Sequence, residues 1–145
     1  MLLSERSIKK LMKGAKRMRY VDLMFVDREH KVNCEYFVEK FCNRAGDREA
    51  KTLIYILTSL DKFRCDFSKY YDAERKVISD LDELLADPLV AFSDSEFALL
   101  RLAYHLFTSN DYDINFVNTF DCLDKTFSKL AICAIKYRFK LEGGF

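Results

Sequence analysis

The sequence contains few of the residues that interrupt helices and strands, with one Pro and four Gly among 145 residues, and it contains no Trp. Because Pro and Gly mark tight turns, their scarcity argues against a fold of many short strands. No apolar run approaches the roughly 18 residues that a membrane-spanning helix needs, and residues 1–6 lack the apolar region of a secretory signal. We therefore expect a cytoplasmic protein, in a bacterial cell or an infected host cell, without a transmembrane segment.

The number and spacing of Cys and His argue against a disulfide framework and against the common catalytic motifs. The chain contains an odd number of Cys, at positions Cys34, Cys42, Cys65, Cys122 and Cys133. They form no CxxC pair, and four of the five lie within apolar or helical patterns. This usage is typical of reduced thiols that pack as small hydrophobic side chains. With two His and no motif of catalytic or phosphate-binding spacing, we predict no catalytic residue and no cofactor.

What the chain does contain is a globular balance of apolar and charged residues. Half of the sequence is hydrophobic, 32% is charged, and 13 Phe and 8 Tyr supply bulky core residues. A chain of this length and composition is typical of one folded domain. The net charge of +1 conceals an asymmetry, because residues 1–20 carry seven Lys or Arg against one Glu.

Helix-start residues recur before segments with apolar side chains at helical spacing. The predicted N-caps are Asp27, Asp47, Asp72 and Ser93, the last within a Ser-Asp-Ser-Glu capping box. The first of these helices should end near Gly46, and the third should end at Asp87–Pro88 because Pro disfavours helical geometry in the preceding residue. The pattern predicts an all-α, single-domain bundle of about six or seven helices.

The last of these predicted helices is the longest. Apolar residues recur at alternating steps of four and three throughout 116–141, which favours one continuous helix after an N-cap at Asn115. Its middle, Leu130–Ile135, is apolar on every side, so we expect the shorter helices to pack around it. The same repeat would also suit the seam of a homodimer.

The first segment, residues 1–19, is predicted to be a basic amphipathic helix or arm, which we call the basic arm. Its apolar stripe is formed by Ile8, Leu11, Met12, Ala15 and Met18. Its candidate binding residues are Lys9, Lys10, Lys13, Lys16 and Arg17. Such an arm can contact a protein partner, follow a phosphate backbone through residues 6–19, lie on an anionic membrane, or simply pack on the domain.

Four short segments carry a resemblance to a known family. They are Phe25–His30, Thr52–Leu57, Leu100–Phe107 and Ala134–Phe139. In this order they resemble a family of small uncharacterised helical proteins from Gram-positive bacteria and their phages and plasmids. The resemblance covers roughly residues 23–139 and implies an all-α fold and an origin in a mobile element or bacterium. It implies no activity.

Two residue spacings resemble parts of known metal-binding patterns. His30 and Cys34 lie four residues apart on one helical face, which could supply two zinc ligands of the three or four required. Asp111 and Asp113 resemble the start of a calcium loop, but the residues that the template requires later are missing. A weaker alternative to a binding protein is a small hydrolase or metal enzyme built around Glu29, His30 and His105. We predict no metal, with His30 and Cys34 as the weak candidates.

Two cations stand among apolar neighbours, Arg101 and Arg138. They could line a groove for an anionic ligand or a partner's carboxylates, or they could pair with an acid such as Asp72, Asp121 or Asp124.

The leading functional hypothesis is a non-enzymatic protein-binding module, an accessory protein of a phage, plasmid or other mobile element that modulates host machinery, such as a defence system. The alternative is a nucleic-acid-binding protein that uses the basic arm.

Overall fold

The computed structural model describes residues 23–42, 47–64 and 67–141, and within them the chain is mostly helical. The α-helices are α2 (Arg28–Phe41), α3 (Arg48–Thr58), α4 (Leu81–Ala86), α5 (Asp94–Thr108), α6 (Phe116–Cys122) and α7 (Lys125–Arg138). Two 3₁₀ turns, Asp61–Phe63 and Phe67–Lys69, and a hairpin of β1 (Tyr71–Asp72) and β2 (Val77–Ile78) lie between α3 and α4. The predicted helical single domain is confirmed.

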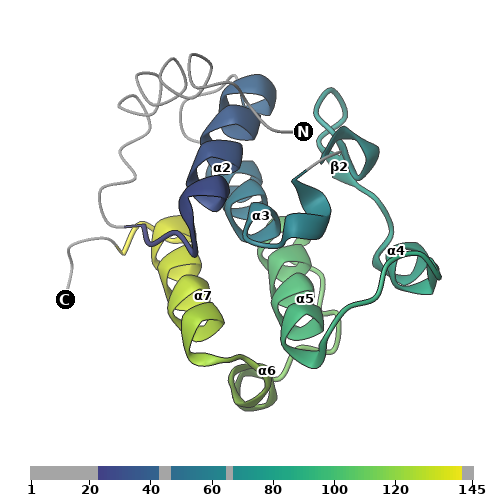
Figure 1. Cartoon of the computed structure of the whole chain (residues 1–145), viewed down its shortest axis with the longest axis vertical. Helices are drawn as coiled ribbons and strands as arrows, with labels where there is room; N and C mark the ends of the chain where they lie inside the picture. The colour runs from purple at the N-terminus through teal and green to yellow at the C-terminus, as the bar shows by residue number, and fades with distance from the viewer. Residues whose placement is uncertain (1–22, 43–46, 65–66, 142–145) are drawn as a thin grey trace.

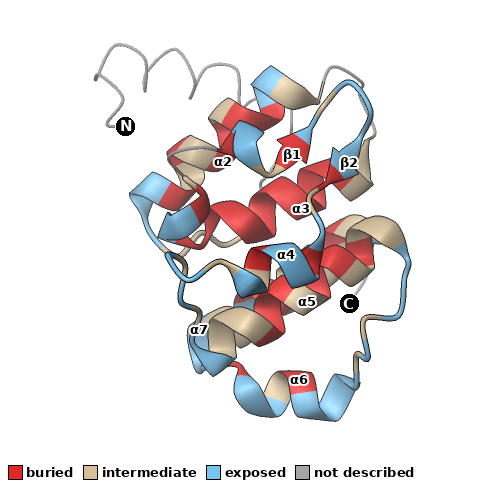
Figure 2. Cartoon of the chain, turned by 90° about the vertical axis from the view of Figure 1, so that its right-hand side faces the viewer, coloured by how far each residue is buried: buried red, intermediate tan, exposed pale blue. Residues whose placement is uncertain are grey.

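The central element is α3. It lies between α2 on one side and α5 and α7 on the other, as two perpendicular views show (Figures 1 and 2). Every residue in 50–58 is buried. Because these nine positions include all sides of a helix, other elements must surround α3, and this explains its continuous run of large apolar side chains at Leu53–Leu57.

Four predicted N-caps are confirmed, each by a short polar side chain that closes the first turn of a helix. Asp27 accepts a hydrogen bond from the backbone N–H of His30, and Asp47 accepts one from that of Ala50. Ser93 forms a complete capping box with Glu96. Asn115 caps α6 as expected. These N-caps satisfy donors that the first helical turn leaves unpaired.

The predicted single helix over 116–141 is wrong, because the structure divides it into α6 and α7. Leu123 and Asp124 have extended backbone, with ψ of 136° and 174°. The Asp124 carboxylate accepts a hydrogen bond of 2.7 Å from the N–H of Phe127 and so starts α7 as an N-cap. Asp121 and Lys125 consequently belong to different helices, and the final segment cannot act as one central post.

The helix expected from Asp72 onwards is also wrong. Tyr71 pairs with Ile78 and Asp72 with Val77 in an antiparallel hairpin. The Asp72 carboxylate accepts hydrogen bonds from the N–H groups of Glu74 and Arg75, which favours a turn over a helix. The helix there, α4, starts only after a second cap at Asp80 and ends before Asp87–Pro88, as predicted.

The helix expected to end near Gly46 ends earlier, because α2 stops at Phe41 and Cys42 has non-helical backbone, with φ of −113° and ψ of 83°. The basic arm lies outside the described residues. In the described ranges, no helix is long and apolar enough to cross a membrane. The four cysteines in these ranges are present as thiols and not as disulfides: Cys34, Cys42, Cys122 and Cys133.

Candidate functional site

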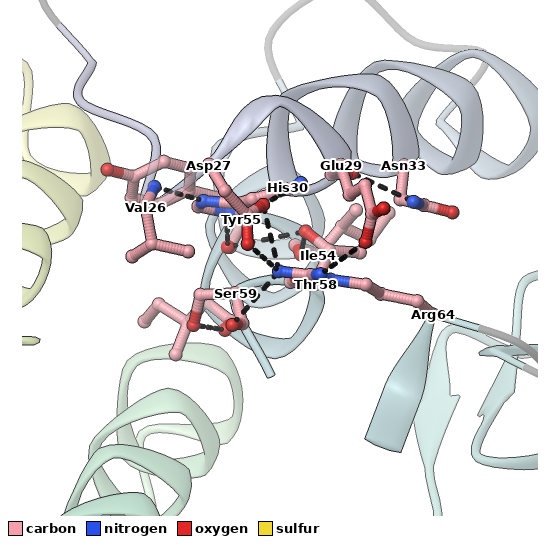
Figure 3. A network of polar contacts seen from close by, with 11 residues as sticks. Val26, Asp27, Glu29, His30, Asn33, Ile54, Tyr55, Thr58, Ser59 and Arg64 are labelled. Atoms are coloured by element: carbon pink, nitrogen blue, oxygen red, sulfur yellow. Dashed lines mark hydrogen bonds and ion pairs between the residues drawn. The ribbon is translucent and has the colours of Figure 1, made fainter. Parts of the chain in front are cut away.

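The residue with the strongest metal-binding or catalytic potential, His30, lies in the first turn of α2 and packs on α3 (Figure 3). Its Nδ1 accepts a hydrogen bond of 3.1 Å from the N–H of Val26. Its Nε2 lies 2.7 Å from the carbonyl oxygen of Tyr55. Since a carbonyl can only accept, Nε2 carries the proton, and both ring nitrogens are used within the fold. His30 therefore has no lone pair left for a metal ion or a substrate proton.

Arg64 extends this arrangement to the ends of two helices (Figure 3). Its guanidinium donates hydrogen bonds to the carbonyl oxygens of Thr58 (2.8 Å) and Ser59 (3.3 Å) at the end of α3. It also forms ion pairs of 3.2 Å with Asp27 and 3.3 Å with Glu29 at the start of α2. A cation is favourable beside a helix C-terminus, so Arg64 stabilises the α2–α3 contact. We call His30, Tyr55, Arg64 and Asp27 the α2–α3 junction.

The α2–α3 junction is expected to make stability depend on pH. Burial is the main cause that lowers the pKa of His30 from 6.5 to about 4, partly opposed by its hydrogen bond to Tyr55. Between these values the unfolded chain binds a proton that the folded chain does not, so stability decreases as pH falls from about 6.5 to 4. The loss should approach about 3 kcal/mol.

Urea unfolding at several pH values measures this loss. A His30→Gln variant should show a smaller decrease over the same range, and the comparison cancels the contributions of all other groups. An identical pH profile for the two proteins would contradict the role of His30.

The other residues proposed for a metal or hydrolase site, Cys34, His105 and Glu29, do not form a site together with His30. The described residues contain no group of three or more His, Cys, Asp or Glu side chains arranged to hold a metal ion. Cys34 is completely buried. His105 lies on α5, where Nδ1 is 2.6 Å from the carbonyl oxygen of Asn110. Glu29 is engaged with Arg64.

Arg101 and Arg138 are held mainly by backbone carbonyl groups, and not by the three Asp suggested from sequence. The Arg101 guanidinium donates to the carbonyl oxygens of Tyr112 and Asp113, and it lies over the ring of Phe97. Because Tyr112 and Asp113 have positive φ angles of 52° and 55°, these bonds stabilise a strained loop.

Arg138 occupies a different place, near the end of α7. Its Nε donates to the carbonyl oxygen of Leu106, 3.1 Å away, and its guanidinium lies 3.6 Å from the Glu49 carboxylate. Arg138 thus joins α7 to α5 and α3, whereas Arg101 holds the loop before α6. The remaining predicted binding residues, Lys9, Lys10, Lys13, Lys16 and Arg17, lie outside the described residues.

Among the hollows on the described part of the surface, two lie beside residues of the predicted or observed polar clusters. The larger, of about 470 Å³, is lined by residues of β2 and the ends of α3 and α5, including Glu49, Lys76 and Ser79. The smaller, of about 250 Å³, lies between α5 and α6 and includes Arg101 and Cys122. Lys76 lies within ion-pair distance of Asp47 and Glu49, so the one cation among the described residues that line the larger hollow is already paired within the fold.

The most distinctive surface is formed by α6. Phe116 and Val117 are 63% and 64% exposed, and the rings of Phe116 and Phe120 lie 4.6 Å apart. Residues 109–124 contain four Asp and no Lys or Arg, and all four Asp are exposed: Asp111, Asp113, Asp121 and Asp124. We call these three apolar residues and four acids the α6 surface.

Sequence reasoning missed the α6 surface because it assigned Phe116 and Phe120 to a buried seam. Exposure of Phe116 follows from the break after Cys122, which lets α6 lie at the edge of the molecule (Figure 2). The available indication was Asp124 itself, since Asp is among the preferred N-cap residues.

Comparison with known proteins places the chain in a family without adding an activity. No curated protein and no solved structure matches it. A family model described as a family of unknown function, DUF6075, matches residues 20–143, which include the whole described fold. The four sequence segments that suggested an uncharacterised helical family all fall within this range. The chain therefore belongs to the family of unknown function DUF6075.

Proposed function

We propose that this protein is a non-enzymatic protein-binding module and that its partner docks on the α6 surface. The observation that carries the proposal is the exposure of two adjacent large apolar side chains, Phe116 and Val117, on a helix of which only Thr119 is buried. Exposed aromatic residues gathered in a patch are typical of interaction sites, whereas single exposed apolar residues are common everywhere.

The charge of the α6 surface defines the partner further. Four exposed Asp flank the apolar centre in sequence, and residues 109–124 contain no Lys or Arg. Interfaces combine an apolar core with a polar rim of complementary charge. The partner is therefore a protein that presents an apolar groove or cleft bordered by Lys and Arg.

The engagement of three polar side chains within the fold supports the same interpretation. His30 and Arg64 use their polar atoms to join α2 to α3, and Arg101 uses its guanidinium to hold the loop before α6. The polar chemistry of these residues thus supports the scaffold that presents α6. In line with the sequence resemblance, we extend the proposal to an accessory protein of a phage, plasmid or other mobile element that modulates host machinery.

The test compares capture of proteins from a Gram-positive lysate by three immobilised full-length chains. One is unchanged, one carries Phe116→Ser with Val117→Ser, and the third is the matched control Leu89→Ser. Leu89 is 91% exposed in the loop after α4, so its replacement removes a similar apolar side chain elsewhere. We expect a specific protein to be captured by the unchanged chain and the control, and at least about tenfold less by the α6 variant.

Two further outcomes bear on the proposal. Capture should weaken as salt rises, because exposed charges at an interface rim are screened. Equal capture of the same proteins by the unchanged chain and the α6 variant would contradict docking at α6.

A further inference from the structure

Helix α7 presents a stripe of basic residues to solvent. At about 100° per residue, four of its side chains fall within a sector of about 60°, namely Lys125, Lys129, Ile132 and Lys136. The buried residues of α7 lie on the opposite side of the helix, centred on Ala134. Lys125 and Lys129 are exposed, and Ile132 is 40% exposed. We call the four residues of this sector the α7 stripe.

The charge of the chain changes sign at the break between α6 and α7. Residues 109–124 contain four Asp and no Lys or Arg, whereas residues 125–141 contain five Lys or Arg and no Asp or Glu. Arg138 bonds inward to α5 and α3, so the outward charge of α7 comes from its Lys residues. Helix α6 lies at the end of α7 where the two join, so the acidic and the basic surfaces are neighbours in the molecule (Figure 1).

Charges of both surfaces remain without ion-pair partners in the described part of the chain. Its ion pairs include no acid of the α6 surface and neither of the first two lysines of the α7 stripe. Asp121 and Lys125 are four residues apart, yet they belong to different helices and do not pair. Both surfaces also carry exposed large apolar side chains, Phe116 and Val117 on α6 and Ile132 on α7. Because interfaces combine an apolar centre with complementary charge at the rim, the two surfaces fit each other.

We propose that the occupant of the α6 surface, when no other partner is bound, is the α7 stripe of a second copy of this chain. Because this proposal uses the α6 surface as a docking site, it rests on the proposed function and names a further occupant for the same site. A nucleic acid or an anionic membrane would match the α7 stripe alone, whereas a second copy matches both surfaces at once. A partner protein captured at α6 would displace the second copy.

The connection between the two helices favours a dimer with two-fold symmetry. In such a dimer each α6 lies on the α7 of the other copy, so both contacts form together. On α6, Val117 and Asp121 each lie about 160° from the buried Thr119 and therefore face outward. The lengths also agree, because Lys125 and Lys136 are about 16 Å apart along α7 and the seven residues of α6 extend about 10 Å.

The test is sedimentation of the full-length chain at low salt, with the charges of one surface reversed at a time. The unchanged chain should sediment as a concentration-dependent dimer. The α7 reversal is Lys125→Glu with Lys129→Glu, and the α6 reversal is Asp111→Lys with Asp121→Lys. Each should weaken the dimer by at least about tenfold, because like charges then face each other. None of these four residues caps a described helix, so both variants should retain the helical content of the unchanged chain, measured by circular dichroism.

An equimolar mixture of the two reversed variants separates a lost contact from a damaged fold. In a mixed dimer, the introduced lysines of one chain face the introduced glutamates of the other, and the native Asp and Lys residues face each other in the second contact. We expect the mixture to form a dimer about as stable as that of the unchanged chain. The matched control is Lys40→Glu with Lys69→Glu, which changes two exposed Lys elsewhere and should leave the dimer intact.

Failure of the dimer and failure of the proposed function give different results. A chain that stays a monomer but still captures a lysate protein through Phe116 and Val117 would overturn the second copy as occupant and leave the proposed function intact. A dimer with the expected charge dependence, in a chain that captures no protein, would support the second copy alone. A dimer that the α7 reversal leaves intact, or that mixing does not restore, would contradict the second copy as occupant. So would a monomer whose retention of duplex DNA is lost in the α7 reversal, since the α7 stripe would then bind phosphate groups.

Discussion

Replacement of His30 by Ala is expected to lower the free energy of unfolding by about 3 kcal/mol. His30 is completely buried, and its two ring nitrogens pair the N–H of Val26 and the carbonyl of Tyr55. Alanine leaves both backbone groups without their side-chain partner and creates a cavity beside the rings of Phe25 and Tyr55, whose centroids lie 5.0 and 5.2 Å from that of His30. Urea unfolding at pH 7 measures the loss.

His105→Ala is the matched control, since it removes the other histidine. That ring is half-buried and bonds one carbonyl in a surface loop, so we expect a loss of less than about 1 kcal/mol. If His30→Ala were no more destabilising than His105→Ala, the α2–α3 junction would not be a structural centre of the fold.

Ile56→Ala is expected to destabilise the protein by about 3–4 kcal/mol. The Ile56 side chain is fully buried in α3, where surrounding helices prevent collapse of the cavity. Ile132→Ala removes the same atoms from α7, where Ile132 is 40% exposed, and should cost less than about 1 kcal/mol. Thermal or urea unfolding of the two variants gives the comparison.

This pair of variants decides which helix is central. The sequence pattern suggested the final helix, with Ile132 in its all-apolar middle, whereas the structure surrounds α3. A larger loss for Ile132→Ala than for Ile56→Ala would contradict the central position of α3.

Features predicted correctly from sequence depend on local chemistry. Asp27, Asp47, Ser93 and Asn115 each cap a helix through a side chain that reaches only three residues along the chain. Such contacts can form whatever the rest of the fold does, so the residue type and its position are enough to predict them.

Features that failed depend on competition or on distant residues. The steps of four and three over 116–141 continue through Leu123 and Asp124, because each of two helices supplies its own apolar face, and spacing alone does not register a change of axis. The role of His30 depends on Tyr55, 25 residues away, and helical spacing with Cys34 carries no information about that contact.

These two kinds of error affect the functional interpretation in opposite ways. The α2–α3 junction turns an apparent metal or catalytic candidate into a packing element with both nitrogens engaged. The break at Asp124 turns an apparent core residue, Phe116, into an exposed one. Together they weaken the case for a metal or catalytic site at the start of α2 and add the α6 surface as a candidate site that the sequence did not suggest.

The most direct test of the proposed α6 docking surface is hydrogen–deuterium exchange of the full-length chain, free and bound to the lysate protein that it captures. Contact at the α6 surface predicts slower exchange in Phe116–Cys122 and the preceding loop on binding, with little change in α3, which is already buried. Unchanged exchange in Phe116–Cys122, with protection confined to another segment such as the start of α2, would contradict it.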